Sequence, residues 1–495
     1  MLYALLILLI YLYYLNLGFP QVWMPNESFY AYASKIMLNS GDFLTPYYNG
    51  SIRLEKPPLT YWMISLGYYL FGVNEFGLRF FHVTLGILTG LVTYFLAQDQ
   101  LKDVKVSLLS ALVLLSSFQF FANARYASPE MPFTFFITLS LYLWLKSYKK
   151  KSVLILILAF TSSSLAIMTK GPAGFIIPAG VVFTYLFLNN PKELLKKRYY
   201  LLTILVILPA FWWYIFEFLF HRKDLLKVFY IENIKRIYEG SDPLYFYLLD
   251  TLVSFLPYSF LVFLALTWAF LKLRRELSFF IAWFVFVFIL FSFVKSKIPV
   301  YILPAYPAMS ILTADFILNS RWEKLIKYSS TFLSLLISMT ILFLTFYFEL
   351  EKIYITLAFL PLLFLLRYWR FSLILAGIVF LIFMNTGMLT YLESFRHYRD
   401  LGNFIKTLDP TSSLKTYEVG YFHHNLPFYA DRIIIKDKIP EKNSLIIFNL
   451  RSFNGCKPIK IWELYTSSES RFVTFLFDTK SKRRFERFGV CIYNR

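Results

Sequence analysis

The sequence contains few charged residues. Only 16% of its 495 residues are charged, whereas 58% are hydrophobic and 21% are aromatic. A soluble chain of this length needs far more polar surface, so the composition excludes one. The apolar runs are about as long as a helix that crosses the bilayer core, and they lack the alternation of membrane β-strands. The composition therefore predicts an all-α, polytopic membrane protein.

Several motif classes are also missing. The chain has no glycine-rich phosphate loop, so a nucleotide-linked sugar or dinucleotide has no recognisable site. Its five histidines show no spacing of the HExxH type, so no obligate metal is predicted. No internal repeat is evident, and the charged residues that could have a function lie at one surface rather than inside the spans. Both observations argue against a transporter or flippase.

The hydrophobic pattern predicts about thirteen transmembrane helices. The first lacks the basic region and cleavage site of a signal peptide, so we expect it to be retained. The predicted spans are 2–19, 76–98, 107–121, 132–147, 153–169, 173–189, 200–219, 246–271, 278–294, 299–318, 329–348, 353–366 and 371–392.

Basic residues predict the orientation of this bundle. With a cytoplasmic N-terminus, roughly 18 of them lie in about 45 inside-loop positions and roughly 13 in about 100 outside positions, as the positive-inside rule expects. The net charge of +20 then reflects topology and anionic lipids, and requires no nucleic acid. We predict a multi-pass membrane protein with a transmembrane domain over 1–392 and a soluble domain over 393–495 on the outer face.

The C-terminal region from 393 onward is predicted to be a small α/β domain. Its apolar stretches Ile433–Ile435, Leu445–Phe448 and Phe472–Phe477 are typical of short strands between polar turns. Cys456 and Cys491 are the only cysteines. They could pair in an oxidising compartment, but their spacing alone leaves the pairing open.

The outer loops combine carboxylates with basic groups. Joining a sugar to a hydroxyl needs a group that orients or deprotonates that hydroxyl. A donor on a lipid phosphate also needs cations that stabilise the leaving phosphate. The residues that meet these needs are Glu27, Asp42, Glu55, Glu130, Glu232, Lys56, Lys170, Arg236, Lys295 and Lys297. The alternative is ordinary snorkelling and helix capping.

Short motifs in a set order extend this interpretation. They are Asn26–Ala31, Ser40–Phe43, Asn49–Gly50, Glu55–Trp62, Arg125–Pro132, Thr169–Pro172, Glu232–Arg236 and Ser296–Pro304. In this order they resemble the outer loops of GT-C membrane glycosyltransferases, in particular the lipid A aminoarabinose transferases and the protein mannosyltransferase superfamily. The resemblance covers about 390 residues, nearly all of the membrane part, and is weak in the tail; it implies a GT-C fold.

The resemblance implies catalytic roles for Asn26, Glu27 and Glu130. The family has an acid pair where this chain has Asn26 and Glu27, and an amide cannot act as a base at neutral pH. The role of the first acid would then pass to Glu27 or Glu130, or orientation alone would suffice, or activity would be lost. Alternatively, Asn26-Glu27 and Glu130 simply cap the helices that they precede.

The resemblance further implies a donor phosphate site. Its residues would be Glu55, Lys56, Lys170, Arg236, Lys297 and Tyr301. Pro57 and Pro58 restrict the backbone and so fix the direction of Lys56. Alternatively, Lys170 snorkels to the surface. Lys297 and Tyr301 are four residues apart, so we predict that they share one helix face. In the alternative interpretation, this pair anchors a span at the membrane interface.

The resemblance leaves the metal requirement open. Asn233 stands where relatives have histidine, so the family's metal site lacks that ligand here. No cofactor is certain; Glu55 and Glu130 remain weak candidates for a divalent metal.

The activity implied is transfer of a sugar from a polyprenyl (undecaprenyl) phosphate donor to lipid A or a related envelope glycolipid at the periplasmic face. The expected partners are that donor, that acceptor and membrane lipids. The alternatives are an enzyme like the protein O-mannosyltransferases and a non-catalytic transporter or scaffold.

Overall fold

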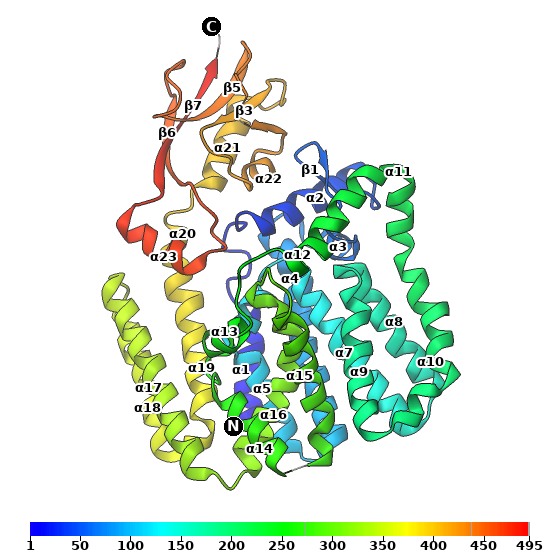
Figure 1. Ribbon diagram of the computed structural model, residues 1–495. Helices are drawn as coiled ribbons and strands as arrows, with labels where there is room; N and C mark the ends of the chain where they lie inside the picture. The colour runs from blue at the N-terminus through cyan, green and yellow to red at the C-terminus, as the bar shows by residue number, and fades with distance from the viewer. Residues whose placement is uncertain (273, 437, 494–495) are drawn as a thin grey trace. The chain divides into compact units, whose positions relative to one another are not determined.

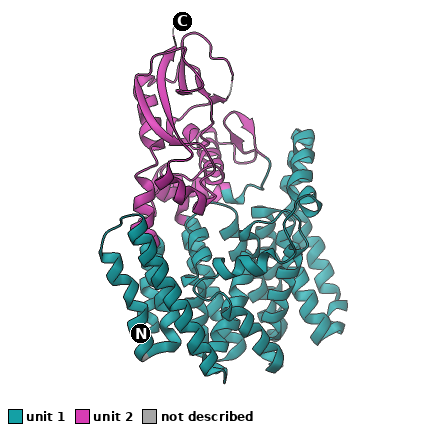
Figure 2. Ribbon diagram, turned by 60° about the vertical axis from the view of Figure 1, so that its left-hand side comes forward, with its two compact units in different colours: residues 1–15, 54–60, 81–383 teal, residues 16–53, 61–80, 384–495 magenta. Residues whose placement is uncertain are grey.

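The computed structural model describes residues 1–272, 274–436 and 438–493, and most of them are helical. The chain forms two compact units, each assembled from segments far apart in the sequence (Figure 2). Unit 1 contains residues 1–15, 54–60 and 81–383, and unit 2 contains 16–53, 61–80 and 384–495. Unit 2 thus combines the C-terminal region with most of the residues between the first two predicted spans, 20–75. The division into domains at residue 392 stays a prediction.

Unit 1 is built from helices. Within it, α7, α8 and α9 pack in sequence order, and so do α17, α18 and α19 (Figure 1). Its α-helices are α1 (Leu2–Tyr14), most of α4 (Glu75–Leu101), α5 (Val104–Ser116), α6 (Phe118–Ala124), α7 (Glu130–Lys150), α8 (Val153–Lys170), α9 (Ala173–Asn189), α10 (Lys197–Leu202), α11 (Trp212–Phe229), α12 (Arg236–Tyr238), α13 (Phe246–Ser254), α14 (Leu261–Lys272), α15 (Ser278–Ser292), α16 (Tyr306–Asn319), α17 (Glu323–Tyr347), α18 (Ile353–Tyr368) and α19 (Ser372–Ile382).

The predicted class of polytopic α-helical membrane protein is confirmed, but the number of about thirteen spans is not. Within the described residues, seven helices are long and apolar enough to cross a membrane, or eight if the bent pair α5 and α6 forms one span. Four further apolar helices, α1, α9, α14 and α18, are shorter than a full span. Several predicted runs are therefore shorter or broken as helices.

Prolines account for two of these breaks. Pro257 separates α13 from α14 inside the predicted span 246–271, because proline supplies no backbone N–H for a continuing helix. The predicted span 299–318 begins instead as a 3₁₀ helix, Pro299–Ala305, which precedes α16. This tight segment carries Tyr301, so the break shapes the candidate site.

The loop expected at 220–245 is helical for most of its length. α11 is followed by a π-helical turn, Tyr230–Lys235, and then by α12. The helical backbone therefore extends beyond the apolar span and presents Glu232 and Arg236 one turn apart.

Unit 2 contains a five-stranded mixed sheet, as expected for a small α/β domain (Figure 1). The strand order is β4-β3-β5-β7-β6, with β3 parallel to β4 and β5, and β7 antiparallel to β5 and β6. The strands are β3 (Thr416–Val419), β4 (Ile434–Lys436), β5 (Ser444–Asn449), β6 (Lys460–Tyr465) and β7 (Phe485–Tyr493). The other elements are α2 (Asn26–Ser40), the hairpin β1 (Tyr47–Tyr48) and β2 (Ser51–Ile52), most of α3 (Leu59–Phe71), α20 (Leu389–Glu393), α21 (Tyr398–Leu408), α22 (Leu426–Ala430) and α23 (Phe472–Ser481).

Two of the three strands predicted in the tail are confirmed and one is wrong. Ile433–Ile435 overlaps β4 and Leu445–Phe448 lies within β5, whereas Phe472–Phe477 lies in the helix α23. A short apolar run without alternation does not distinguish a strand from a buried helix. Here the run continues to Asp478, whose carboxylate accepts a hydrogen bond from the Tyr465 hydroxyl at 2.9 Å and favours the helix.

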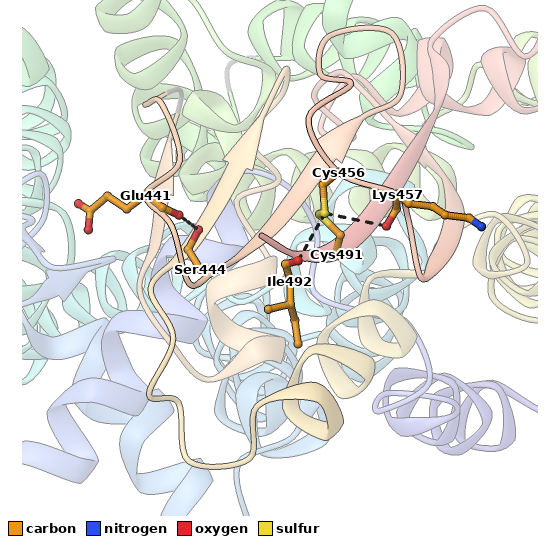
Figure 3. Close-up of a disulfide and its surroundings, with 6 residues drawn as sticks. All are labelled: Glu441, Ser444, Cys456, Lys457, Cys491 and Ile492. Atoms are coloured by element: carbon orange, nitrogen blue, oxygen red, sulfur yellow. Dashed lines mark hydrogen bonds between the residues drawn. A yellow bond between two sulfur atoms is a disulfide. The ribbon is translucent and has the colours of Figure 1, made fainter. Parts of the chain in front are cut away.

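A disulfide joins Cys456 and Cys491, so the pairing left open by the sequence is formed (Figure 3). Cys491 lies on β7 opposite Ile446 of β5, and Cys456 lies in the connection before β6. The bond therefore ties this connection to a central strand of the sheet. Near it, the Ser444 hydroxyl donates a hydrogen bond to the Glu441 carbonyl at 2.5 Å (Figure 3).

Buried ion pairs hold an irregular stretch of unit 2, residues 17–24. Arg79 donates to the carbonyls of Leu17, Pro20 and Gln21 at 2.7–3.1 Å, and pairs with Glu27 at 2.7 Å. Arg396 donates to the carbonyls of Gln21 and Val22 and pairs with Glu469 at 2.8 Å. Backbone that is neither helix nor strand needs such partners when it is buried.

Candidate active site

A short rigid segment of unit 1 presents Lys56. Pro57 and Pro58 follow it and are buried, so the backbone has little freedom there. The Lys56 ammonium lies 2.6 Å from a carboxylate oxygen of Glu232, and the two side chains are only 16% and 13% exposed. The predicted fixed position of Lys56 is thus one end of an ion pair with little exposure to solvent.

Glu232 and Arg236 form the next link. They are four residues apart in the helical segment after α11, and the Arg236 guanidinium contacts the other oxygen of Glu232 at 2.7 Å. The same guanidinium donates to the Tyr301 hydroxyl at 2.6 Å. Backbone hydrogen bonds between 236–242 and 295–296 hold the two segments together.

Lys170 and Glu130 complete the group. Lys170 is the last residue of α8, and its ammonium lies 3.1 Å from the Glu130 carboxylate at the start of α7. It also lies 5.0 Å from the centre of the Tyr301 ring, a cation–π distance. Gly171 follows with φ +86°, and a Cβ there would lie 2.5 Å from the Tyr214 hydroxyl. A glycine is therefore required for the chain to turn away directly after Lys170.

These contacts form one continuous group, which we call the ion chain. It holds three cations and two carboxylates, so it carries one excess positive charge if all are ionised. Five separate segments of unit 1 contribute to it. Its members are Lys56, Glu130, Lys170, Glu232, Arg236 and Tyr301.

Burial and neighbouring charges shift two pKa values in the ion chain. Burial lowers the pKa of Lys56 below its ordinary value, and the nearby Glu232 carboxylate opposes this effect without cancelling it. Burial alone would raise the pKa of Glu130, but Lys170 and a hydrogen bond from Ser128 bring it below its ordinary value. Glu130 is therefore a carboxylate at neutral pH, and the charged form of Lys56 carries a cost in desolvation.

The chemistry of the ion chain suits a phosphate. Ammonium, guanidinium and phenol donors converge from different segments, and such donors bind phosphate oxygens strongly at sites of low exposure. An ionised carboxylate beside them can accept a hydrogen bond from a hydroxyl. The group can thus bind an anion and orient an alcohol within one unit.

Four of the predicted phosphate-side residues lie in the ion chain: Lys56, Lys170, Arg236 and Tyr301. Glu55 is half-buried and adjoins Lys56 in the sequence. Lys297 contacts Asp242 instead: its backbone N–H donates to the Asp242 carboxylate at 2.8 Å, and its ammonium donates to the Asp242 carbonyl at 3.1 Å. Lys297 therefore stabilises the connection between α12 and α13, residues 239–245.

The predicted shared helix face of Lys297 and Tyr301 is wrong. Lys297 precedes the 3₁₀ helix that contains Tyr301, so the spacing of four residues does not align them. The alternative role for Lys170, a lysine that reaches the surface, also disagrees with the structure. Its side chain is 14% exposed and is paired with Glu130.

The acceptor-side residues are divided. Asn26 is exposed, Glu27 is fully buried against Arg79 in unit 2, and Glu130 lies in the ion chain of unit 1. The capping alternative holds only in part, because Glu27 and Glu130 lie in the first turns of their helices but neither Asn26 nor Glu130 occupies the N-cap position. The N-cap positions are Pro25 and Pro129, and neither helix has a side-chain cap hydrogen bond. Glu130 is thus the carboxylate that lies beside the cations.

The sequence analysis listed Glu232 among the outer-loop carboxylates but assigned it neither to the acceptor site nor to the phosphate site. The signal that could have found it is its spacing of four residues from Arg236, which favours an ion pair on a helix. For the weak metal candidates Glu55 and Glu130, the structure offers no support: the described residues contain no group of three or more histidine, cysteine, aspartate or glutamate side chains that could hold a metal ion.

The chain is similar to several known proteins. The family model of the dolichyl-phosphate-mannose-protein mannosyltransferases matches residues 1–226. A protein of Aquifex aeolicus (strain VF5) without an assigned function is 53% identical over 489 residues, 98% of each chain. The undecaprenyl phosphate-alpha-4-amino-4-deoxy-L-arabinose arabinosyl transferase of Edwardsiella ictaluri is 29% identical over 336 residues, 64% of this chain and 59% of that enzyme.

A solved structure shares the fold over almost the whole chain. The crystal structure of ArnT from Cupriavidus metallidurans bound to undecaprenyl phosphate has a TM-score of 0.78 at 19% identity, and the match covers 98% of this chain and 97% of that one. The first 226 residues thus resemble the protein mannosyltransferase family, and the chain resembles the aminoarabinose transferases in sequence over 64% of its length and in fold over 98%. The sequence match spans about three fifths of the Edwardsiella enzyme, so donor and acceptor are treated below as proposals.

Proposed function

We propose that the protein transfers a sugar from a polyprenyl-phosphate carrier, undecaprenyl phosphate, to lipid A or a related envelope glycolipid. The observation that carries this proposal is the ion chain, in which Lys56, Lys170, Arg236 and Tyr301 converge in one unit. They would bind the phosphate that links sugar to lipid and stabilise its charge as the sugar departs. Two similar proteins support the same donor: the Edwardsiella protein is an undecaprenyl phosphate-alpha-4-amino-4-deoxy-L-arabinose arabinosyl transferase, and the Cupriavidus ArnT structure is bound to undecaprenyl phosphate.

Glu130 is the residue that we assign to the acceptor hydroxyl. It is a buried carboxylate 3.1 Å from Lys170, so it lies beside the proposed phosphate site. Because its pKa is held below the ordinary value, it is a weak base. The Glu130 carboxylate then accepts a hydrogen bond from the acceptor hydroxyl, which orients it, and takes up its proton late in the transfer. Asn26 lacks this capacity, and Glu27 is committed to Arg79.

We place the reaction at the periplasmic face of a bacterial inner membrane, with a cytoplasmic N-terminus. The distribution of basic residues supports this orientation. The Cys456–Cys491 disulfide supports an oxidising surrounding for the C-terminal region. A lipid-linked donor also agrees with a sequence that has no recognisable nucleotide-sugar motif.

The test is a transfer assay with purified protein in proteoliposomes that contain an undecaprenyl-phosphate sugar and lipid A. Glu130→Gln is expected to lower kcat roughly a hundredfold, since the amide cannot accept the proton. Glu130→Asp should retain most activity, because it keeps the carboxylate. Glu276→Gln, at a carboxylate that is 54% exposed, is the matched control. Absence of any sugar transfer by the wild-type protein would refute the proposal.

A second candidate function is transfer of the sugar to protein hydroxyl groups. The match of residues 1–226 to the family of protein mannosyltransferases favours it. The same proteoliposomes should then modify a peptide rich in serine and threonine, and mass spectrometry would detect a glycopeptide in place of a modified lipid. Both candidate functions use the same donor phosphate site. The product of the reaction, a modified lipid or a glycopeptide, distinguishes them.

A further inference from the structure

Glu232 lies where an anion would bind. One of its oxygens is 2.6 Å from the Lys56 ammonium, and the other is 2.7 Å from the Arg236 guanidinium. Its side chain is 13% exposed, so this contact is shielded from water. A carboxylate that bridges two cations in this way makes the same charge-assisted hydrogen bonds that two oxygens of a phosphate would make.

The two anions compete for the same cations. A phosphate between Lys56 and Arg236 would stand where the Glu232 carboxylate lies. If both remained, like charges would meet at a site of low exposure, which is unfavourable. If neither were present, Lys56 would be a buried ammonium without this counter-charge, and leaving one partner of a buried pair alone is strongly unfavourable.

We propose that Glu232 is an internal placeholder for the donor phosphate, a proposal that rests on the function proposed above. In the unoccupied protein Glu232 neutralises Lys56 and keeps Arg236 aligned. Donor binding replaces the carboxylate, so that Lys56 and Arg236 exchange one anion for another and are never left uncompensated. Glu232 thus lowers donor affinity while it preserves the geometry of the site.

The test compares binding of undecaprenyl phosphate in phosphatidylcholine nanodiscs across variants of the full chain. Glu232→Gln removes the competing charge, so the dissociation constant at pH 6–7 is expected to fall roughly fivefold or more. Glu239→Gln is the matched control, because Glu239 also pairs with a cation four residues away, Lys235, but is 52% exposed. It should bind like wild type. Undecaprenol, which has no phosphate, should bind all variants equally.

A pH series separates the placeholder role from a general structural role. Since the Glu232 carboxylate supports the charge of Lys56, Glu232→Gln should lose its gain in affinity at a lower pH than that at which wild type weakens. Glu232→Asp, whose shorter side chain cannot reach both cations equally, should lie between wild type and Glu232→Gln. This conservative variant serves as the main comparison if Glu232→Gln unfolds.

The outcomes are distinct. Unchanged or weaker binding by Glu232→Gln and Glu232→Asp at pH 6–7, with binding lost in Lys56→Ala, would overturn the placeholder and leave the proposed function intact. The same binding by wild type and Lys56→Ala would refute the phosphate site itself. Tighter binding by Glu232→Gln that extends to undecaprenol would also overturn the proposal, because the phosphate would not be its cause.

Discussion

The ion chain of unit 1 and the buried ion pairs of unit 2 use the same residue types for different ends. In unit 2, Arg79 and Arg396 are at most 1% exposed, and their carboxylate partners Glu27 and Glu469 are fully buried. These arginines also donate to several backbone carbonyls. In unit 1, Lys56 and Arg236 share one carboxylate, and the group has an excess cation and partial exposure. Saturated, buried pairs hold a backbone, whereas shared, partly exposed cations can receive a ligand.

Removing one partner of the saturated pairs should have the largest effect. Glu27→Gln leaves the Arg79 guanidinium without its counter-charge at 1% exposure, and we expect it to destabilise the protein by about 3–5 kcal/mol. Thermal unfolding in detergent would measure the loss. Glu463→Gln, which removes an exposed partner of Lys482, should cost less than about 1 kcal/mol. Equal stability of both variants would erase the distinction between the two units.

The next largest effect is expected at Lys56. Lys56→Ala removes a cation from the proposed phosphate site and should lower kcat/KM for the lipid-linked donor about a hundredfold. The fold should persist, because the lysine is held at a desolvation cost that the variant relieves. Parallel unfolding and transfer measurements would check this. A collapse of stability with normal activity per folded molecule would place Lys56 with the structural pairs of unit 2.

The pH dependence sharpens the same contrast. The pKa of Lys56 lies below its ordinary value, so the cation is lost as the pH rises through that lowered pKa. Donor kcat/KM should therefore begin to fall at a pH below about 10.4, the usual pKa of lysine. Lys56→Arg should remove this alkaline limb, because arginine stays protonated throughout. A profile of kcat/KM from pH 7 to 11 is the measurement, and an identical limb in both proteins would contradict the assignment.

The smallest effect is expected at Asn26. Its side chain is exposed, and it belongs to neither the ion chain nor the buried pairs. Asn26→Ala should change kcat/KM by no more than roughly twofold, as surface substitutions usually do. Asn26→Asp introduces the acid that the family resemblance implies at this position. A gain of tenfold or more in that variant would return the acceptor role to this position and take it from Glu130.

The sequence predicted the membrane fold and the position of Lys56 for physical reasons that act locally. Long apolar runs specify helices in lipid, and a lysine before two prolines has a fixed direction. Glu27 was predicted to be a catalytic residue because its motif does not reveal that it pairs with Arg79. Arg79 is 52 residues away, but a charge inside the predicted span 76–98 was a signal that a buried counter-ion was needed.

Other features depended on contacts that no local pattern contains. The link from Arg236 to Tyr301 joins residues 65 positions apart, and the pair of Lys56 with Glu232 joins residues 176 apart. The sequence of α23 predicts a strand, because it does not reveal the contact between Asp478 and Tyr465. Helix breaks at Pro257 and before α16 were hidden by uniformly apolar composition, because hydrophobicity alone does not report a missing N–H donor.

The pairing of Arg396 with the backbone of residues 21 and 22 bears on how the chain is made. The carbonyls of Gln21 and Val22 emerge from the ribosome about 375 residues before the guanidinium that satisfies them, and Glu469, which binds the N–H of Met24, follows later still. Until then this stretch must rely on water or a chaperone. A chain that stops before residue 396 would keep the defect permanently. Membrane proteases should therefore remove such truncated chains, even if every apolar helix has been inserted.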